Sequence, residues 1–174
     1  MLSHANNPTT LNLTNEGTGQ VIDVYIPRYE DLWFRKMFMS DENTMSYNHA
    51  WGGIIDFSED KWTDWYDYWV EKPHAERFYR YLQKTETKKF VGEISYHFNG
   101  NEYIADVIVF SKYRGNGYGK EGLRLLCEAA KQAGIEYLYD DIAIDNPAIT
   151  MFLKMGFIEE YRTDDIIMLK KKLI

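Results

Sequence analysis

Three alternating glycines, Gly115, Gly117 and Gly119, follow an apolar run that ends at Phe110. Directly after them, residues 120–134 carry apolar side chains at helical spacing, which predicts an amphipathic helix. Glycines let backbone N–H groups approach an anion closely, and a helix N-terminus adds partial positive charge. A strand, a glycine loop and a helix in this order therefore predict a site for the phosphates of a cofactor.

The spacing of these glycines excludes two common phosphate-binding patterns. The dinucleotide fingerprint requires G-x-G-x-x-G, whereas these glycines alternate strictly. A Walker A loop requires serine or threonine after its lysine, and glycine five positions before its second glycine. Glu121 and Arg114 occupy those two positions. What remains is the pattern Arg-x-x-Gly-x-Gly, formed by Arg114, Gly117 and Gly119.

A second segment, residues 145–157, reads Asp-Asn-Pro-Ala-Ile-Thr-Met-Phe-Leu-Lys-Met-Gly-Phe. Its local chemistry predicts a short helix, because Asn146 is a good N-cap and Pro147 fits the first helical position. Gly156 suits the left-handed residue after the last turn. Together the two segments resemble the motifs of the GNAT superfamily of acetyl-CoA-dependent N-acetyltransferases, and the resemblance covers residues 88–172.

The resemblance implies that acetyl-CoA is the acetyl donor and that the glycine loop holds its pyrophosphate. The residues that map onto this loop are Arg114, Gly115, Asn116, Gly117, Tyr118 and Gly119. Backbone N–H groups near Val109 and Phe110 are expected to polarise the thioester carbonyl, and Asn146 to contact the cofactor arm. Simpler roles stay open: the glycines could only shape a strand-to-helix turn, and Asn146 could only cap a helix.

Phe152 departs from the pattern of the superfamily, in which this position is frequently a tyrosine that protonates the sulfur of CoA. Phenylalanine has no exchangeable proton. Either the thiolate leaves without help, since a thiol has a pKa of about 8.5, or another group donates the proton. Tyr118, Tyr139 and a water molecule are the alternatives.

Acetyl transfer also needs a base, because a free alkyl amine has a pKa of roughly 10 and arrives charged at neutral pH. We predict that Glu93 or Asp106 is this base, or anchors a water relay. Each lies in a predicted strand, where an acid is costly unless it is paired or faces a wet cleft. Either could instead face a polar surface. His49 and His97 are further candidates, since histidine titrates nearest neutrality.

The resemblance places the acceptor pocket in the segment between the first two helices. The residues expected to bind the substrate there are Tyr47, Asn48, His49 and Trp51, although an aromatic plug over the core is equally consistent. The second helix carries tryptophans on one face and acids on the other. We expect those acids to face solvent rather than to form a polyamine site.

These residues must be positioned by a regular succession of elements. Alternation predicts strands at 20–26, 77–83, 90–98, 103–110, 136–142, 157–163 and 166–172. Helical spacing predicts helices at 28–40, 59–71, 120–134 and 147–155, with a long ordered loop at 41–58. This order matches a single α/β (α+β) GNAT-like domain over residues 1–174. The resemblance implies a mixed central sheet of about seven strands, splayed between two central strands and flanked by about four helices. Residues 1–18 are expected to be a flexible or extended segment.

Composition restricts the classes of partner. The net charge of −7 and the pI near 5.1 argue against nucleic acid, and they hint only weakly at a cationic substrate. One cysteine excludes an intrachain disulfide, and no apolar run suits a signal peptide or a membrane span. We therefore expect a cytoplasmic protein without a membrane partner. Four histidines and one cysteine do not form a ligand set, so no metal is expected.

The sequence thus predicts an N-acetyltransferase that moves acetyl from acetyl-CoA directly to a primary amine. A small cationic amine, such as a polyamine or an aminoglycoside-like compound, is the first candidate for the acceptor. The alternatives are the N-terminus of a protein or peptide, and a CoA-binding sensor without turnover, which Phe152 keeps open. A homodimer is compatible with the family resemblance, but the sequence does not determine the oligomeric state.

Overall fold

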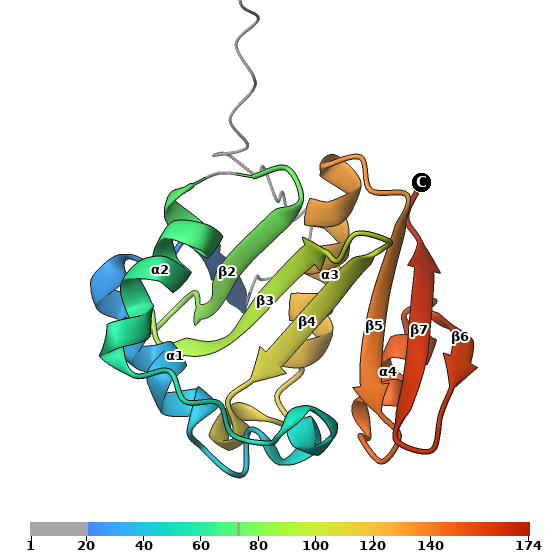
Figure 1. The fold of residues 1–174 in the computed structure, drawn as a ribbon, viewed down its shortest axis with the longest axis horizontal. Coiled ribbons are helices and arrows are strands. Elements are labelled where there is room, and N and C mark those ends of the chain that lie inside the picture. Colours follow the sequence, from blue (N-terminus) through green and yellow to red (C-terminus); the bar gives the residue numbers. More distant parts are fainter. Residues whose placement is uncertain (1–20, 73) are drawn as a thin grey trace, which may run out of the picture.

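The structure, a computed structural model, describes residues 21–72 and 74–174. One mixed sheet of seven strands forms the centre of a single domain, in the order β1-β2-β3-β4-β5-β7-β6 (Figure 1). The strands are β1 (Ile22–Tyr25), β2 (Arg77–Lys84), β3 (Phe90–Phe98), β4 (Tyr103–Val109), β5 (Tyr137–Ala143), β6 (Ile158–Arg162) and β7 (Ile166–Lys172). The α-helices are α1 (Leu32–Met39), α2 (Trp62–Tyr66), α3 (Tyr118–Gln132) and α4 (Ala148–Lys154).

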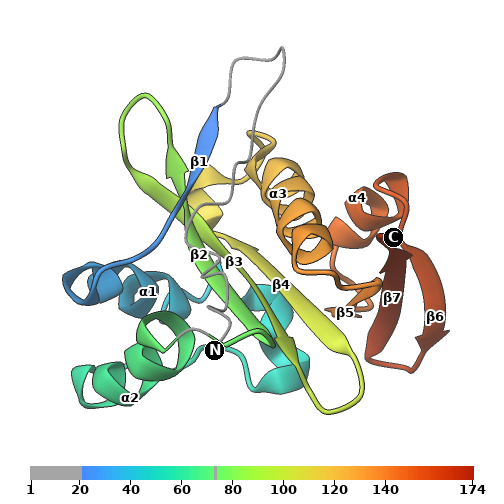
Figure 2. The same cartoon turned by 90° about the horizontal axis from the view of Figure 1, so that it is seen from above.

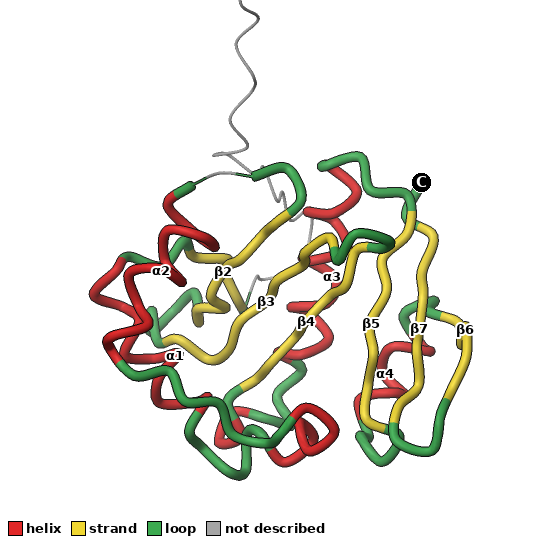
Figure 3. The backbone as a smooth tube through the Cα atoms, viewed as in Figure 1, coloured by secondary structure: helices red, strands yellow, loops and turns green. Residues whose placement is uncertain are grey.

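Five short 3₁₀ or π-helical segments complete the described residues (Figure 3): η1 (Tyr29–Asp31), η2 (Ser46–Trp51), η3 (Glu59–Lys61), η4 (Asp67–Glu71) and η5 (Ser111–Tyr113). The predicted strands and the helices expected at 120–134 and 147–155 form with ends within two residues of those expected from sequence. The helix expected at 28–40 is built from η1 and α1 in succession. The helix expected at 59–71 is built from η3, α2 and η4 in succession. The terminal segment expected at 1–18 lies outside the described residues. None of the helices within the described ranges is long and apolar enough to cross a membrane.

Strands β4 and β5 separate in the middle of the sheet. They are its one parallel pair among the described strands, and they share only the register pairs Tyr103↔Leu138 and Ile104↔Tyr139. Figure 1 shows that the two strands diverge from there toward their C-terminal ends. The predicted splay is therefore present, and it opens where the glycine loop follows β4 and the α4 segment follows β5.

Helices cover both faces of the sheet (Figure 2). On one face, α3 buries Leu123, Leu126 and Ala130 against the strands, as its amphipathic pattern predicts. Gly122 allows this close approach, because a Cβ there would lie 2.8 Å from the Leu82 Cδ1 atom. The lone cysteine, Cys127, is buried in the same core. This packing holds the N-terminus of α3 beside the point where β4 and β5 diverge.

The opposite face is packed with aromatic rings from α1, α2 and the sheet. The rings of Phe34 and Phe38 lie 5.0 Å apart, and those of Trp65 and Tyr79 lie 4.7 Å apart. Trp65 packs inward while Asp64, one residue earlier, is exposed. The expectation that the tryptophans of this helix face the core and its acids face solvent is confirmed.

A buried ion pair lies within this aromatic layer. Arg35 Nη1 is 2.5 Å from each carboxylate oxygen of Glu93, and the Tyr79 hydroxyl also donates to that carboxylate. Glu93 is only 2% exposed. Burial, together with the Glu93 charge, raises the pKa of Tyr79 well above its ordinary value, so its hydroxyl keeps its proton. Arg35 and Glu93 stabilise each other, because either charge alone would be buried without a compensating partner.

We expect Glu93→Leu to lower the free energy of unfolding by about 3–5 kcal/mol, since it leaves Arg35 as a buried cation without a partner. The double variant Arg35→Met/Glu93→Leu should recover much of this loss, because it removes both charges together. Urea unfolding followed by circular dichroism measures both effects. Glu159→Gln, which breaks an exposed ion pair with Arg162, is the control and should leave the midpoint unchanged. A stable Glu93→Leu single variant would contradict this account.

Candidate functional site

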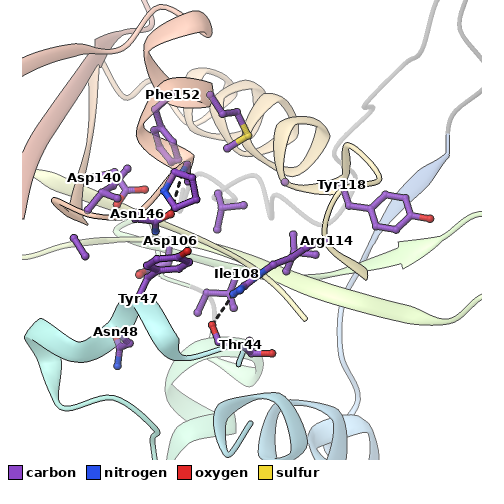
Figure 4. Close-up of a pocket in the computed structure, with 18 of the residues that line it drawn as sticks. Thr44, Tyr47, Asn48, Asp106, Ile108, Arg114, Tyr118, Asp140, Asn146 and Phe152 are labelled. Carbon is purple, nitrogen blue, oxygen red and sulfur yellow. Dashed lines mark hydrogen bonds between the residues drawn. The ribbon is translucent and has the colours of Figure 1, made fainter. Parts of the chain in front are cut away.

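A cavity of about 590 Å³ opens where β4 and β5 diverge. The segment around η2 lines it on the α1 and α2 side of the sheet, while the glycine loop, α3 and α4 line it on the other side (Figure 4). Residues of β4 and β5 lie between the two. The cavity therefore joins the two faces of the sheet, so two ligands that enter from opposite faces could meet inside it.

The glycine loop has the geometry expected for an anion site. Gly115 and Gly117 have φ angles of 78° and 80°, in the left-handed region that favours glycine. Gly117 directly precedes α3, a helix of 15 residues whose first N–H groups lack partners within the helix. Gly119 lies in the first turn, where an added Cβ would be 3.7 Å from Val109 and 3.8 Å from Met151. These features suit a phosphorylated ligand that passes between β4 and α4.

Seven of the nine cofactor residues expected from sequence line the cavity, namely Val109, Arg114, Gly115, Gly117, Tyr118, Gly119 and Asn146. Val109 is part of its wall. Asn146 also lines it, and its Oδ1 atom accepts a hydrogen bond from the Ala148 N–H at 2.9 Å. The capping role of Asn146 is thus confirmed, and its Nδ2 group has no partner among the described residues. The same carboxamide can therefore cap α4 and offer a donor to a ligand.

Phe110 requires a correction. Its backbone N–H donates to the Val91 carbonyl at 2.9 Å, and its side chain belongs to the aromatic core. This N–H is therefore not available to polarise a ligand carbonyl. Because successive N–H groups of a strand point to opposite edges, the N–H of Val109 faces the open edge toward β5. Asn116 also lies outside the cavity wall, since its amide donates to the carbonyls of Tyr113 and Arg114.

Arg114 connects the glycine loop to the segment between α1 and α2. Its guanidinium donates to the carbonyl of Asn43 at 3.1 Å and to that of Thr44 at 2.6 Å. The carboxylate of Asp41 accepts from the Thr44 N–H and from the Ser111 hydroxyl, both at 2.8 Å. The Thr44 hydroxyl also donates to this carboxylate, and this bond, followed by that of Ser111, lowers the pKa of Asp41. One end of residues 41–53, called the 41–53 segment below, is thereby fixed beside the glycine loop.

The other end of the 41–53 segment is fixed on the β5 side. His49 Nε2 lies 2.9 Å from the Asp145 carboxylate, and the Trp51 indole hydrogen bonds to Asp141. Of the expected substrate-binding residues, Tyr47, Asn48 and Trp51 line the cavity, whereas His49 does not. The Asn48 amide donates to the Gly53 carbonyl at 2.6 Å. The segment therefore crosses the mouth of the cavity and is attached at both ends.

The structure separates the two acids expected to act as base. Asp106 lines the cavity, and its carboxyl is accessible from it. The surrounding protein desolvates this carboxyl, and with the charges of Glu93 and Asp141 it raises the pKa of Asp106 to about 7. Glu93 is not among the lining residues, and its carboxylate is held by Arg35. A direct role for Glu93 stays a prediction that this geometry does not favour.

The remaining candidates lie away from the centre of the cavity. His97 is not a lining residue, and burial lowers its pKa. Tyr139 does not line the cavity either, and Figure 4 shows the hydroxyl of Tyr118 directed away from Phe152. Phe152 itself is 3% exposed, with its ring 5.0 Å from that of Phe157. Neither Tyr118 nor Tyr139 therefore places its hydroxyl where a tyrosine at position 152 would place one.

Sequence reasoning missed two acids of β5, Asp140 and Asp141, which also line the cavity. The signal was present, since both interrupt the apolar strand Tyr137–Ala143 as Asp106 interrupts β4. Burial raises the pKa of Asp140 well above its ordinary value and also raises that of Asp141. Within the part of the chain that is described, no group of three or more His, Cys, Asp or Glu side chains could hold a metal ion.

Comparison with known proteins gives a family and a fold. Residues 32–157 match the Acetyltransferase (GNAT) family. No curated protein matches the sequence significantly. The fold is similar to spermidine N-acetyltransferase from Vibrio cholerae in complex with CoA and spermine, with a TM-score of 0.73 and 17% identity over 87% of this chain and 95% of that one.

Two further solved structures share the fold. One is the acetyltransferase (GNAT family) from Bacillus anthracis, with a TM-score of 0.70, 16% identity and coverage of 90% of this chain and 97% of that one. The other is yncA from Salmonella typhimurium with its cofactor acetyl-CoA, with a TM-score of 0.69, 16% identity and coverage of 89% and 95%. At these sequence identities the three structures show only that the fold is shared. The match of residues 32–157 to the family is what shows membership.

We expect Arg114→Ala to loosen the 41–53 segment, because it removes the hydrogen bonds to the carbonyls of Asn43 and Thr44. A loss of about 1 kcal/mol corresponds to roughly fivefold faster amide exchange in this segment. Hydrogen–deuterium exchange with mass spectrometry measures it. Lys112→Ala is the matched control, because the Lys112 ammonium lies over the rings of Phe110 and Tyr113. Equal exchange in both variants would refute this role for Arg114.

Proposed function

The chain belongs to the GNAT acetyltransferase family, and on that premise we propose that it transfers acetyl from acetyl-CoA to a primary amine of a small cation, with a polyamine as the first candidate. The observation that carries the proposal is the position of Asp106. Its carboxyl opens into a cavity that joins both faces of the sheet, and its pKa of about 7 suits a base that works near neutrality.

The donor side of the proposal rests on the glycine loop and α4. Acetyl-CoA, when bound, supplies an acetyl group that is already activated as a thioester. The loop from Arg114 to Gly119 and the N-terminus of α3 would hold the pyrophosphate. The Val109 N–H at the open edge of β4 would donate to the thioester carbonyl, and the free Nδ2 group of Asn146 would hold the cofactor arm.

The acceptor side rests on charge and on aromatic walls. Asp106 and Asp141 place carboxyl groups where an ammonium would enter, and Tyr47 and Trp51 offer ring faces that attract a cation. Asp106, once ionised, would take the proton of the bound ammonium onto its carboxylate and so free the nitrogen lone pair. The similar fold of a spermidine N-acetyltransferase that was solved with spermine supports the same class of acceptor.

The position of the 41–53 segment across the mouth of the cavity favours a small acceptor over a peptide. A protein N-terminus requires an open groove, whereas the 41–53 segment is attached beside the glycine loop through Arg114 and on the β5 side through His49. A sensor without turnover would not need an accessible carboxyl whose pKa lies near neutrality. Both alternatives are separated from the proposal by the assay below.

Purified protein with acetyl-CoA should release free thiol in the presence of spermidine or spermine, and much less with peptides. The reason is that two carboxyl groups and two aromatic rings recognise a compact cation better than a peptide backbone. A panel of polyamines, aminoglycosides, amino acids and short peptides, followed by a thiol reagent, measures it. Release with peptides alone would favour the N-terminal alternative. Binding of acetyl-CoA in a calorimeter without release on any amine would favour the sensor.

We expect Asp106→Asn to lower kcat by roughly 10²–10⁴-fold, the range that a positioned general base contributes. In the wild-type protein, kcat/KM should rise with pH through about 7, as the Asp106 carboxyl with its raised pKa loses its proton. The variant should lack this rise. Asp164→Asn, in the exposed turn between β6 and β7, is the control and should behave as wild type. A variant that keeps the rise near pH 7 would remove Asp106 from the role of base.

A further inference from the structure

Asp140 has a carboxyl group without a partner in the wall of the cavity. It lies in the middle of β5, is 7% exposed, and makes no hydrogen bond or ion pair with another described residue. It lies on the same face of β5 as Leu138 and Ile142, which pack in the core beneath α3 and α4. Figure 4 shows Asp140 on the side of the cavity that holds Asn146 and Phe152.

The surroundings of Asp140 favour its neutral, protonated form. Burial is the main cause of its raised pKa, and the charges of Asp106 on β4 and Asp141 on β5 add to it. On β7 the facing residue is Leu169, and the ammonium of Lys171 on that strand donates to the Met155 carbonyl at 2.7 Å. Near α3 and α4, the other titratable or polar groups in the lining are those of Asn146, Tyr118 and Lys120. The rest of the lining adds Tyr113 and Arg114 after β4, and Thr44, Tyr47, Asn48 and Trp51 of the 41–53 segment.

The α4 side of the cavity offers no other acidic proton among its described residues. It is lined by Asn146, Pro147, Ala148, Met151 and Phe152. An amide and apolar side chains cannot donate a proton to a leaving group. The hydroxyl of Tyr118 is directed away from this region in Figure 4. The Asp140 carboxyl, whose surroundings favour its protonated form, is therefore the one acid that the described residues place on this side of the cavity.

We propose that Asp140 is the proton donor to the sulfur of the departing CoA, an inference that rests on the acetyl transfer proposed above. As the amine nitrogen bonds to the acyl carbon, the carbon–sulfur bond breaks and its electron pair passes to sulfur. The Asp140 carboxyl gives its proton to that sulfur. The Asp106 carboxylate, which has by then passed the first proton of the ammonium to water in the cavity, takes the second proton from the nitrogen. Exchange with water in the cavity then restores both carboxyl groups. Asp140 thus performs the step that Phe152 cannot.

The direct test is Asp140→Asn, which keeps the shape of the side chain and removes its acidic proton. We expect kcat to fall about a hundredfold, at the low end of general acid catalysis, with the dissociation constant of acetyl-CoA unchanged. The wild-type rate should decline at alkaline pH as Asp140 ionises, and the variant should lack that decline. Adding Phe152→Tyr to Asp140→Asn should restore much of the rate, because it returns a hydroxyl to the same side of the cavity.

A second readout needs no ligand. A carboxyl whose pKa is raised by folding makes the folded state lose stability as pH rises above the ordinary pKa of about 3.9. Asp140→Asn lacks this loss, so its melting temperature relative to wild type should increase steadily as pH rises above about 4. Asp164→Asn, matched in chemistry and exposed in a turn, should show a constant difference. A constant difference for Asp140→Asn would overturn the proposal, because Asp140 would then be ionised in the folded protein.

The outcomes separate this inference from the function on which it rests. Thiol release by wild type that falls in Asp140→Asn and recovers with Phe152→Tyr supports the donor. Wild-type release with an unchanged rate and alkaline decline in Asp140→Asn overturns the donor and leaves acetyl transfer intact. Wild-type protein that releases no thiol with any amine overturns the proposed function and this inference with it.

Discussion

Strands β4 and β5 share two register pairs, and the absence of further pairing beyond Ile104 creates the opening on which the rest of the site depends. If β4 and β5 stayed paired to their ends, the sheet would be continuous, and no cavity would connect its two faces. The divergence leaves backbone groups of β4 at an unpaired edge, where a ligand can satisfy them. It also directs the chain ends that follow β4 and β5, the glycine loop and the start of α4, toward one cavity.

The two faces of the sheet then divide the chemistry. On the α3 face, the glycines at the start of α3 keep the space beside β4 free of side chains. Together with the N-terminus of α3, this space suits a long phosphorylated ligand. On the other face, aromatic packing and the Arg35–Glu93 pair make a rigid layer behind Asp106. The charge of Glu93 within that layer adds to the rise in the Asp106 pKa, of which burial is the main cause. The stability of the aromatic face and the electrostatics of the cavity are therefore coupled.

The 41–53 segment links acceptor and donor sides through ordinary hydrogen bonds. Arg114 belongs to the glycine loop, but its guanidinium donates hydrogen bonds to the carbonyls of Asn43 and Thr44. Anything that orders the glycine loop therefore also orders the segment that carries Tyr47 and Trp51. This connection explains how a short segment whose regular structure is the 3₁₀ helix η2 can hold aromatic side chains over the cavity.

The sequence by itself determined the elements, the two motifs and the family resemblance. These depend on local properties: alternation, helical spacing, capping at Asn146, and left-handed glycines at Gly115 and Gly117. Only the tertiary structure decided which acids share the cavity. Glu93 and Asp106 are equivalent as acids in apolar strands, yet Arg35, 58 residues before Glu93, pairs with Glu93 and leaves Asp106 open. Tertiary packing decides which residues so distant in sequence become partners. It also decides on which side of β5 Asp140 lies, and no local pattern encodes either.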